Sequence, residues 1–188
     1  TGNIVKIRSR WYDPIDPQVH REVGGSGIIL SPNGPAEKYS LILTAKHVIE
    51  GYTYIDIIFQ KQTIQGEIVA KGHRADWAIL KVARVEASGV RPLDYQDRPI
   101  RLEPCFAVGY SLSINIPVLT KGCIQGIVED KILYTAPTIF GNSGGGVFVM
   151  RDGKYRLAGI SVALYISHMG VVEHLGLACP VWKVLEGN

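Results

Sequence analysis

The sequence predicts an all-β fold, and three observations support this. About a dozen short segments rich in Val, Ile and Tyr recur along the chain, Gly, Pro, Asn and Asp turns separate them, and helical periodicity is almost absent. With 188 residues, 46% apolar and 20% charged, the chain can bury a sizeable core. This composition excludes a disordered protein.

The expected elements follow one another from end to end. Strands are expected at 4–8, 27–30, 39–43, 54–59, 63–70, 77–82, 105–108, 123–128, 131–134, 147–150, 155–164 and 171–179, with a turn at 31–34. Helix is expected only near 45–49 and at 180–186, where Pro180 opens the segment and Gly187 follows it. The stretch 85–99 resembles a linker that divides the strands into two similar halves. This pattern fits two small barrels and also a sandwich.

Composition excludes several classes of function. Lys and Arg number 20 against 17 Asp and Glu, a net charge of +3 that is too small and scattered for a nucleic-acid-binding face. The uncharged stretches 104–120 and 132–150 contain helix-breaking residues, so we expect no membrane span. Cys105, Cys123 and Cys179 lie far apart without a CxxC pair. We therefore expect no metal, no cofactor and three buried thiols, although one pair could form a disulfide.

A glycine-rich turn carries the first candidate catalytic residue. Ser143 lies in the segment FGNSGGG at 140–146, directly before an apolar strand. Glycines beside a nucleophile let the backbone turn sharply and leave N–H groups free to point at one spot, as an oxyanion hole requires. We expect Gly141, Asn142 and Ser143 to form that hole. The alternative is a glycine-rich hairpin with an incidental serine.

A serine hydroxyl needs a base, and His47 is the best candidate among five histidines. An apolar strand ends just before it in LILTAKHV at 41–48, which places the imidazole at a strand end, where clefts form. Asp76 directly precedes an apolar strand and is the candidate carboxylate that orients the base. The alternatives are a structural histidine and an exposed turn-capping aspartate. Asp56 is a rival carboxylate that we expect to face solvent.

With His47, Asp76 and Ser143 in this order, the chain resembles the trypsin-like, chymotrypsin-fold serine peptidases, and within them the HtrA/Deg type. The resemblance covers nearly the whole chain and rests on GSGIIL at 25–30, LTAKHV at 43–48, DWAILKV at 76–82, GNSGG at 141–145, LAGIS at 157–161 and GLACP at 176–180. It implies a single domain over 1–188 made of two six-stranded antiparallel β-barrels and a short C-terminal helix. The N-terminal barrel, 1–84, would carry His47 and Asp76, and the C-terminal barrel, 100–188, would carry Ser143.

The resemblance also implies a serine endopeptidase that works through a His47, Asp76 and Ser143 triad and an acyl-enzyme. Its substrate pocket would be walled by Ala136, Pro137, Thr138, Ser161, Val162, Ala163 and Leu164, with Gly176 behind. These residues include no acid, and Leu164 stands where wide-pocket relatives have Gly. We therefore expect cleavage after small or medium aliphatic residues and poor cleavage after Lys, Arg or Trp. The backbone of 162–164 would bind a polypeptide substrate as an added strand.

The sequence also departs from some members of the family. Members activated by a freed N-terminus have Asp before the nucleophile, where this chain has Asn142, so we expect activity without such an ion pair. HtrA-like relatives often carry a PDZ domain, and none follows within these 188 residues. They often form trimers through the N-terminal segment, where Trp11 and Tyr12 are candidate contacts for a homo-oligomer.

Two further expectations concern the setting of the protein. The resemblance favours an extracytoplasmic location, and a start at Thr1 rather than Met indicates a processed or truncated chain. The alternative to a peptidase is a catalytically silent module, peptide-binding or chaperone-like, on the same fold.

Overall fold

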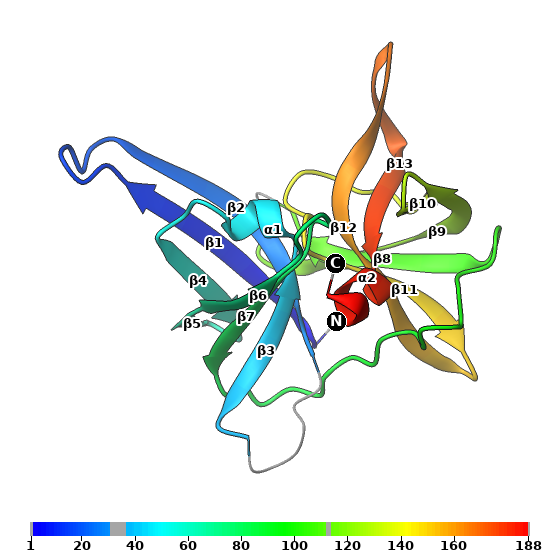
Figure 1. The fold of residues 1–188 in the computed structure, drawn as a ribbon, viewed down its shortest axis with the longest axis horizontal. Coiled ribbons are helices and arrows are strands. Elements are labelled where there is room, and N and C mark those ends of the chain that lie inside the picture. The colour runs from blue at the N-terminus through cyan, green and yellow to red at the C-terminus, as the bar shows by residue number, and fades with distance from the viewer. Residues whose placement is uncertain (1, 31–36, 112–113, 188) are drawn as a thin grey trace.

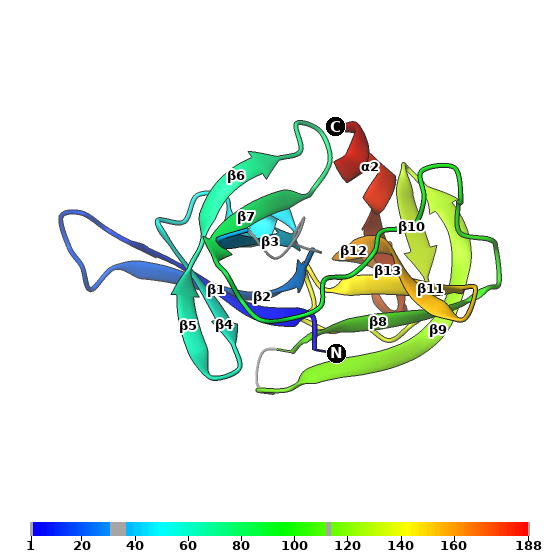
Figure 2. The same ribbon diagram turned by 90° about the horizontal axis from the view of Figure 1, so that it is seen from below.

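The strands form two units that lie side by side in both views of the chain (Figures 1 and 2). The computed structural model describes residues 2–30, 37–111 and 114–187, so the turn predicted at 31–34 lies outside the described residues. The first unit contains β1 to β7 and the second contains β8 to β13. The predicted all-β class is confirmed.

The first unit is an antiparallel sheet of seven strands in the order β5-β4-β1-β2-β3-β7-β6. Its edge strands β5 and β6 are separated along the chain only by Gly66, whose N–H donates to the carbonyl oxygen of Ile55. The predicted N-terminal barrel therefore takes the form of a curled half-barrel sheet whose predicted strand 63–70 bends at Gly66. The elements are β1 (Ile4–Tyr12), β2 (His20–Ile29), β3 (Tyr39–Thr44), the one-turn helix α1 (Lys46–Ile49), β4 (Tyr54–Phe59), β5 (Gln62–Gln65), β6 (Glu67–Lys71) and β7 (Ala78–Ala83).

The second unit is a closed antiparallel barrel of six strands in the order β10-β13-β12-β11-β8-β9. Its elements are β8 (Pro104–Tyr110), β9 (Pro117–Val128), β10 (Lys131–Tyr134), β11 (Gly146–Arg151), β12 (Lys154–Ser167), β13 (Gly170–Pro180) and the helix α2 (Val181–Glu186). Pro180 caps α2 and Gly187 ends it in the left-handed conformation, at a φ of 75°. The predicted C-terminal barrel and terminal helix are confirmed.

Two hairpins extend beyond the strands that the apolar pattern predicted. The β1–β2 hairpin runs out to Tyr12 and His20, and the β12–β13 hairpin runs out to Ser167 and Gly170; both project from the body of the molecule (Figure 1). These extensions mix polar and charged residues with aromatics, glycines and single aliphatic residues, so no clear hydrophobic alternation marks them. At the first hairpin the Arg21 guanidinium lies 4.7 Å from the centre of the Trp11 ring. An oligomer contact at Trp11 and Tyr12 stays a prediction.

The segment between the two units packs against both of them. No strand occurs among residues 84–103, but Val90 N–H donates to the carbonyl oxygen of Ile29 in the first unit, and Leu93 N–H donates to that of Leu157 in the second. Arg151 of β11 also holds Asp97 at 2.9 Å. Within the described residues, no helix combines the length and apolar character that a membrane crossing requires.

Buried apolar side chains from both units form one core cluster, which holds the strands in register. The fully buried side chains include Ile7, Ile28, Ile42, Ile57 and Leu80 in the first unit and Ile124, Ile132 and Tyr134 in the second. All three cysteines are free thiols; Cys105 and Cys179 are buried, as predicted, whereas Cys123 is only half-buried.

Candidate active site

His47 and Asp76 meet because the strands that carry them pair with each other. His47 lies in α1, just after β3, and Asp76 lies just before β7; the pairing of Thr44 with Ala78 brings these two strand ends together. His47 Nδ1 is 2.6 Å from Asp76 Oδ2, and the backbone N–H of His47 donates to Asp76 Oδ1 at 3.0 Å. An ionised carboxylate only accepts hydrogen bonds, so Nδ1 carries the proton and the Nε2 atom of a neutral His47 is left as an acceptor.

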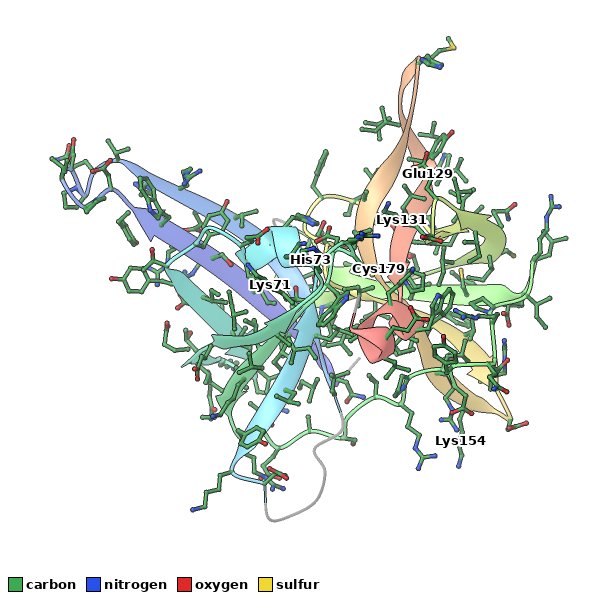
Figure 3. All side chains as sticks on the ribbon, in the orientation of Figure 1. Lys71, His73, Glu129, Lys131, Lys154 and Cys179 are labelled. Carbon is green, nitrogen blue, oxygen red and sulfur yellow. The ribbon has the colours of Figure 1, made fainter. Side chains whose placement is uncertain are left out.

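The environment of Asp76 favours its charged form. Burial alone would raise the pKa of this carboxyl group, but the hydrogen bonds and charge from His47 outweigh burial and lower it. Behind Asp76 lies a cavity of about 440 Å³, bordered on the barrel side by Glu129, Lys131 and Cys179, which Figure 3 labels. Burial and the nearby charge of Asp76 raise the pKa of Cys179 to about 12, so its thiol stays protonated.

The rival carboxylate, Asp56, belongs to a different part of the molecule. We expected it to face solvent, and this was wrong: Asp56 is only 1% exposed. Arg8 and Arg10 each place a guanidinium nitrogen 2.8 Å from its Oδ2 atom, and Gln65 donates to its Oδ1 atom. These partners explain how a charged side chain on β4 can be buried. The four histidines other than His47 are all exposed.

The loop that carries Ser143 is held by its backbone. The carbonyl oxygen of Asn142 accepts from Gly145 N–H at 2.7 Å, Gly144 N–H donates to the carbonyl oxygen of Ser161 at 2.7 Å, and Ser161 N–H donates to that of Gly145 at 2.8 Å. Gly144 has a φ of +86°, and a Cβ atom there would lie 2.0 Å from the carbonyl oxygen of Ser26. Only glycine fits at this position.

Two N–H groups of this loop remain available. Within the described part of the chain, the backbone N–H groups of Gly141 and Ser143 make no hydrogen bond. The N–H of Asn142 donates to the carbonyl oxygen of Ile139 at 3.1 Å, so of the three predicted donors this one is already engaged. The side-chain oxygen of Asn142 is buried without a partner. The two available donors flank Asn142, an arrangement suited to an oxyanion.

His47 and Ser143 line one cavity of about 330 Å³ between the two units. The hydroxyl of Ser143 makes no hydrogen bond to any described residue. Of the predicted pocket residues, Thr138, Ser161, Val162, Ala163 and Leu164 line this cavity, together with Ile139, Phe140, Ile166 and Val171, which the sequence analysis did not select. No acidic side chain is among these lining residues.

The other predicted pocket residues do not line the cavity. Ala136 is buried and Pro137 is exposed, whereas Gly176 packs against Tyr134. Tyr134 is the cross-strand neighbour of Gly176, and a Cβ atom at position 176 would lie 2.4 Å from its ring.

Tyr134 is a residue that sequence reasoning missed. Its hydroxyl lies 2.9 Å from Thr138 Oγ1 and 3.0 Å from Ser161 Oγ, directly behind two cavity-lining residues. Burial raises the pKa of Tyr134 and outweighs the effect of these hydrogen bonds, so its hydroxyl is neutral. The available signal was its alternation with Ile132 on β10, which indicates an inward-facing position.

Comparisons with known proteins point to one family. A family model described as trypsin-like peptidase domain matches residues 25–160. A putative mitochondrial protease of Arabidopsis thaliana, Do-like 12, is 31% identical over 140 residues, which are 66% of this chain and 27% of the plant protein. The chain therefore spans about a quarter of the length of this curated relative.

Solved structures share the fold. The serine endoprotease from Yersinia pestis is similar with a TM-score of 0.75 and 22% identity over 98% of this chain and 61% of that chain. A protease from M. tuberculosis in its active form has a TM-score of 0.78 and 17% identity over 99% of this chain and 79% of that chain.

Proposed function

The chain belongs to the trypsin-like peptidase domain family, as the resemblance in its sequence predicted, and from this membership we propose that it is a serine endopeptidase. Ser143 is the nucleophile, His47 the general base and Asp76 the group that orients His47. The observation that carries the proposal is the 2.6 Å contact between His47 and Asp76 at the cavity that His47 shares with Ser143. A carboxylate at Nδ1 sets the tautomer that a base needs.

The proposed reaction uses these groups in sequence. His47 Nε2 takes the proton of Ser143 Oγ as that oxygen attacks the carbonyl carbon of the peptide bond. The oxyanion that forms accepts hydrogen bonds from the N–H groups of Gly141 and Ser143, the two donors that the loop leaves available. His47 then gives its proton to the leaving amine, and water hydrolyses the acyl-enzyme by the same steps. Asp76 stays ionised throughout.

The substrate backbone would bind along β12. Between Lys154 and Ile160 this strand pairs with β11, but from Ser161 onward it pairs only with β13. The opposite edge of residues 162–167 therefore carries no strand within the described chain. An extended peptide could add to this edge and place a side chain in the cavity beside Ser143.

The cavity favours aliphatic side chains. Val162 and Leu164 contribute apolar walls, and the hydroxyls of Thr138 and Ser161 are tied to Tyr134, which closes the space behind them. A buried Lys or Arg side chain would find no carboxylate among the lining residues that the structure describes, and leaving it unpaired is costly. We propose cleavage after Val, Ala or Leu, with rejection of Arg and Lys.

The experiment that tests the function is labelling with a serine-directed fluorophosphonate, combined with turnover of a tripeptide nitroanilide ending in Val. We expect Ser143→Ala to lose both labelling and turnover while remaining folded. The matched control is Ser9→Ala, since Ser9 is a fully buried serine whose hydroxyl has no partner. If wild-type protein neither labels nor cleaves but still binds peptide, the chain is a catalytically silent peptide-binding module instead.

A further inference from the structure

We propose that Ser26 is a positioning residue for the proposed oxyanion hole, and this inference rests on the proposed function. Ser26 lies on β2 of the half-barrel sheet, whereas the loop that it holds belongs to the barrel. It is fully buried, at 0% exposure, and therefore cannot contact the substrate. It would act through the backbone of Gly141 and Ser143.

Every polar group of Ser26 has a partner. Its backbone N–H donates to the carbonyl oxygen of Ser143 at 2.8 Å, and its hydroxyl donates to the carbonyl oxygen of Gly141 at 2.9 Å. The same hydroxyl oxygen accepts from Tyr110 N–H at 2.8 Å, at the end of β8. Its own carbonyl oxygen accepts from Thr44 Oγ1 at 2.7 Å.

These contacts fix the orientation of the peptide bond that follows Gly141. On one side of this bond the Gly141 carbonyl oxygen is held by Ser26, and on the other side the Asn142 N–H is held by Ile139. Gly141 has a φ of 96° and, without a Cβ atom, little steric resistance to rotation. The Ser26 hydroxyl is the contact that fastens the Gly141 carbonyl from outside the loop. Without this hydrogen bond, rotation about Gly141 would turn the N–H groups of Gly141 and Ser143 away from a common point.

Ser26 also connects the two halves of the proposed machinery. The Thr44 hydroxyl that binds its carbonyl oxygen comes from the last residue of β3, three positions before His47. One residue thus links the strand that leads to the base with the loop that carries the nucleophile. The contacts are long-range, since Ser26 and Gly141 are 115 positions apart.

The test compares Ser26→Ala with Ser9→Ala. Both serines lie on the β1–β2 hairpin and are fully buried, but the Ser9 hydroxyl has no partner. Because the backbone N–H of Ser26 remains, Ser26→Ala removes only the two hydroxyl contacts. We expect kcat on the Val nitroanilide to fall about 10- to 100-fold with KM changed less than about twofold, since one lost oxyanion donor costs about 10²–10³. Affinity for a matching peptide boronate should fall in proportion to kcat.

Ser26→Cys keeps the test valid if the Ala variant does not fold, because it preserves the shape and retains a weaker donor. Its kcat should lie below that of wild type with KM unchanged. The inference is overturned if the folded variants keep the kcat and boronate affinity of Ser9→Ala, or if the loss is entirely in KM. Turnover that survives Ser143→Ala would instead reject the proposed function, so the two failures are distinguishable.

Discussion

The two units contribute different kinds of chemistry to the candidate site. The half-barrel sheet supplies side chains, His47 and Asp76, which meet through direct contact at 2.6 Å. The barrel supplies the proposed nucleophile, Ser143, and also backbone, because the donors proposed for the oxyanion are N–H groups of a loop whose conformation depends on glycine. An exposed side chain can be removed without disturbing its neighbours, whereas Gly144, where a Cβ atom would meet backbone at 2.0 Å, cannot be replaced without moving the chain.

The sharpest test of this difference pairs His47→Ala with Gly144→Ala. The His47 side chain is 46% exposed, so we expect its loss to abolish turnover, by about 10⁴-fold or more, with thermal stability almost unchanged. Gly144→Ala should abolish turnover and also destabilise the fold by about 3 kcal/mol or more, since its Cβ atom would meet backbone at 2.0 Å. Thermal melts followed by circular dichroism measure the stability of both variants. Equal melting temperatures would contradict the expected difference between the side-chain and the backbone contributions.

Asp76→Asn tests only the side chains that the half-barrel sheet supplies. The amide would favour the wrong tautomer of His47, so we expect kcat to fall by about 10³- to 10⁴-fold while KM changes little. Steady-state kinetics on the Val nitroanilide provide the measurement. A kcat within tenfold of wild type would show that Asp76 does not orient the base.

Leu164→Gly tests the contribution of the barrel to substrate preference, because it changes one wall of the cavity and leaves the Ser143 loop in place. We expect the preference for Phe over Val to rise by about 10- to 100-fold, the scale of hydrophobic-pocket discrimination. Profiling with a peptide library checks this, with Tyr165→Ala as a control on the same strand, since Tyr165 is not among the described residues that line the cavity. Dominant cleavage after Arg or Lys in the wild type would contradict the proposed pocket. It would mean that Glu173, whose side chain lies outside the described residues, reaches the cavity.

The smallest expected effect is on stability in acid. Because the pKa of Asp76 is lowered in the folded state, its carboxylate contributes stability above the pKa of the unfolded chain, and that contribution is lost as pH falls through the folded pKa. Between about pH 6 and about pH 3, the difference in unfolding free energy between wild type and Asp76→Asn should shrink. Urea titrations across this range measure it, and a constant difference would contradict the assignment.

Sequence patterns predicted the parts of the site that depend on local composition. Ser143 among glycines, His47 after an apolar strand and Asp76 before one are each visible within a window of a few residues. The same patterns failed for Asp56, because its burial depends on Arg8, which lies 48 positions away. They also did not indicate that Tyr134 fills the space beside Gly176.

The sequence by itself determined the fold class, the succession of strands along the chain and the residue types that can carry the chemistry, because alternation, turn residues and glycines act over short distances. Only the tertiary structure decided that the strand at 63–70 bends at Gly66, that Tyr134 closes the pocket, and that Ser26 fastens the Gly141 loop. These are contacts between segments far apart along the chain. Their geometry depends on how two sheets pack, which no local pattern encodes.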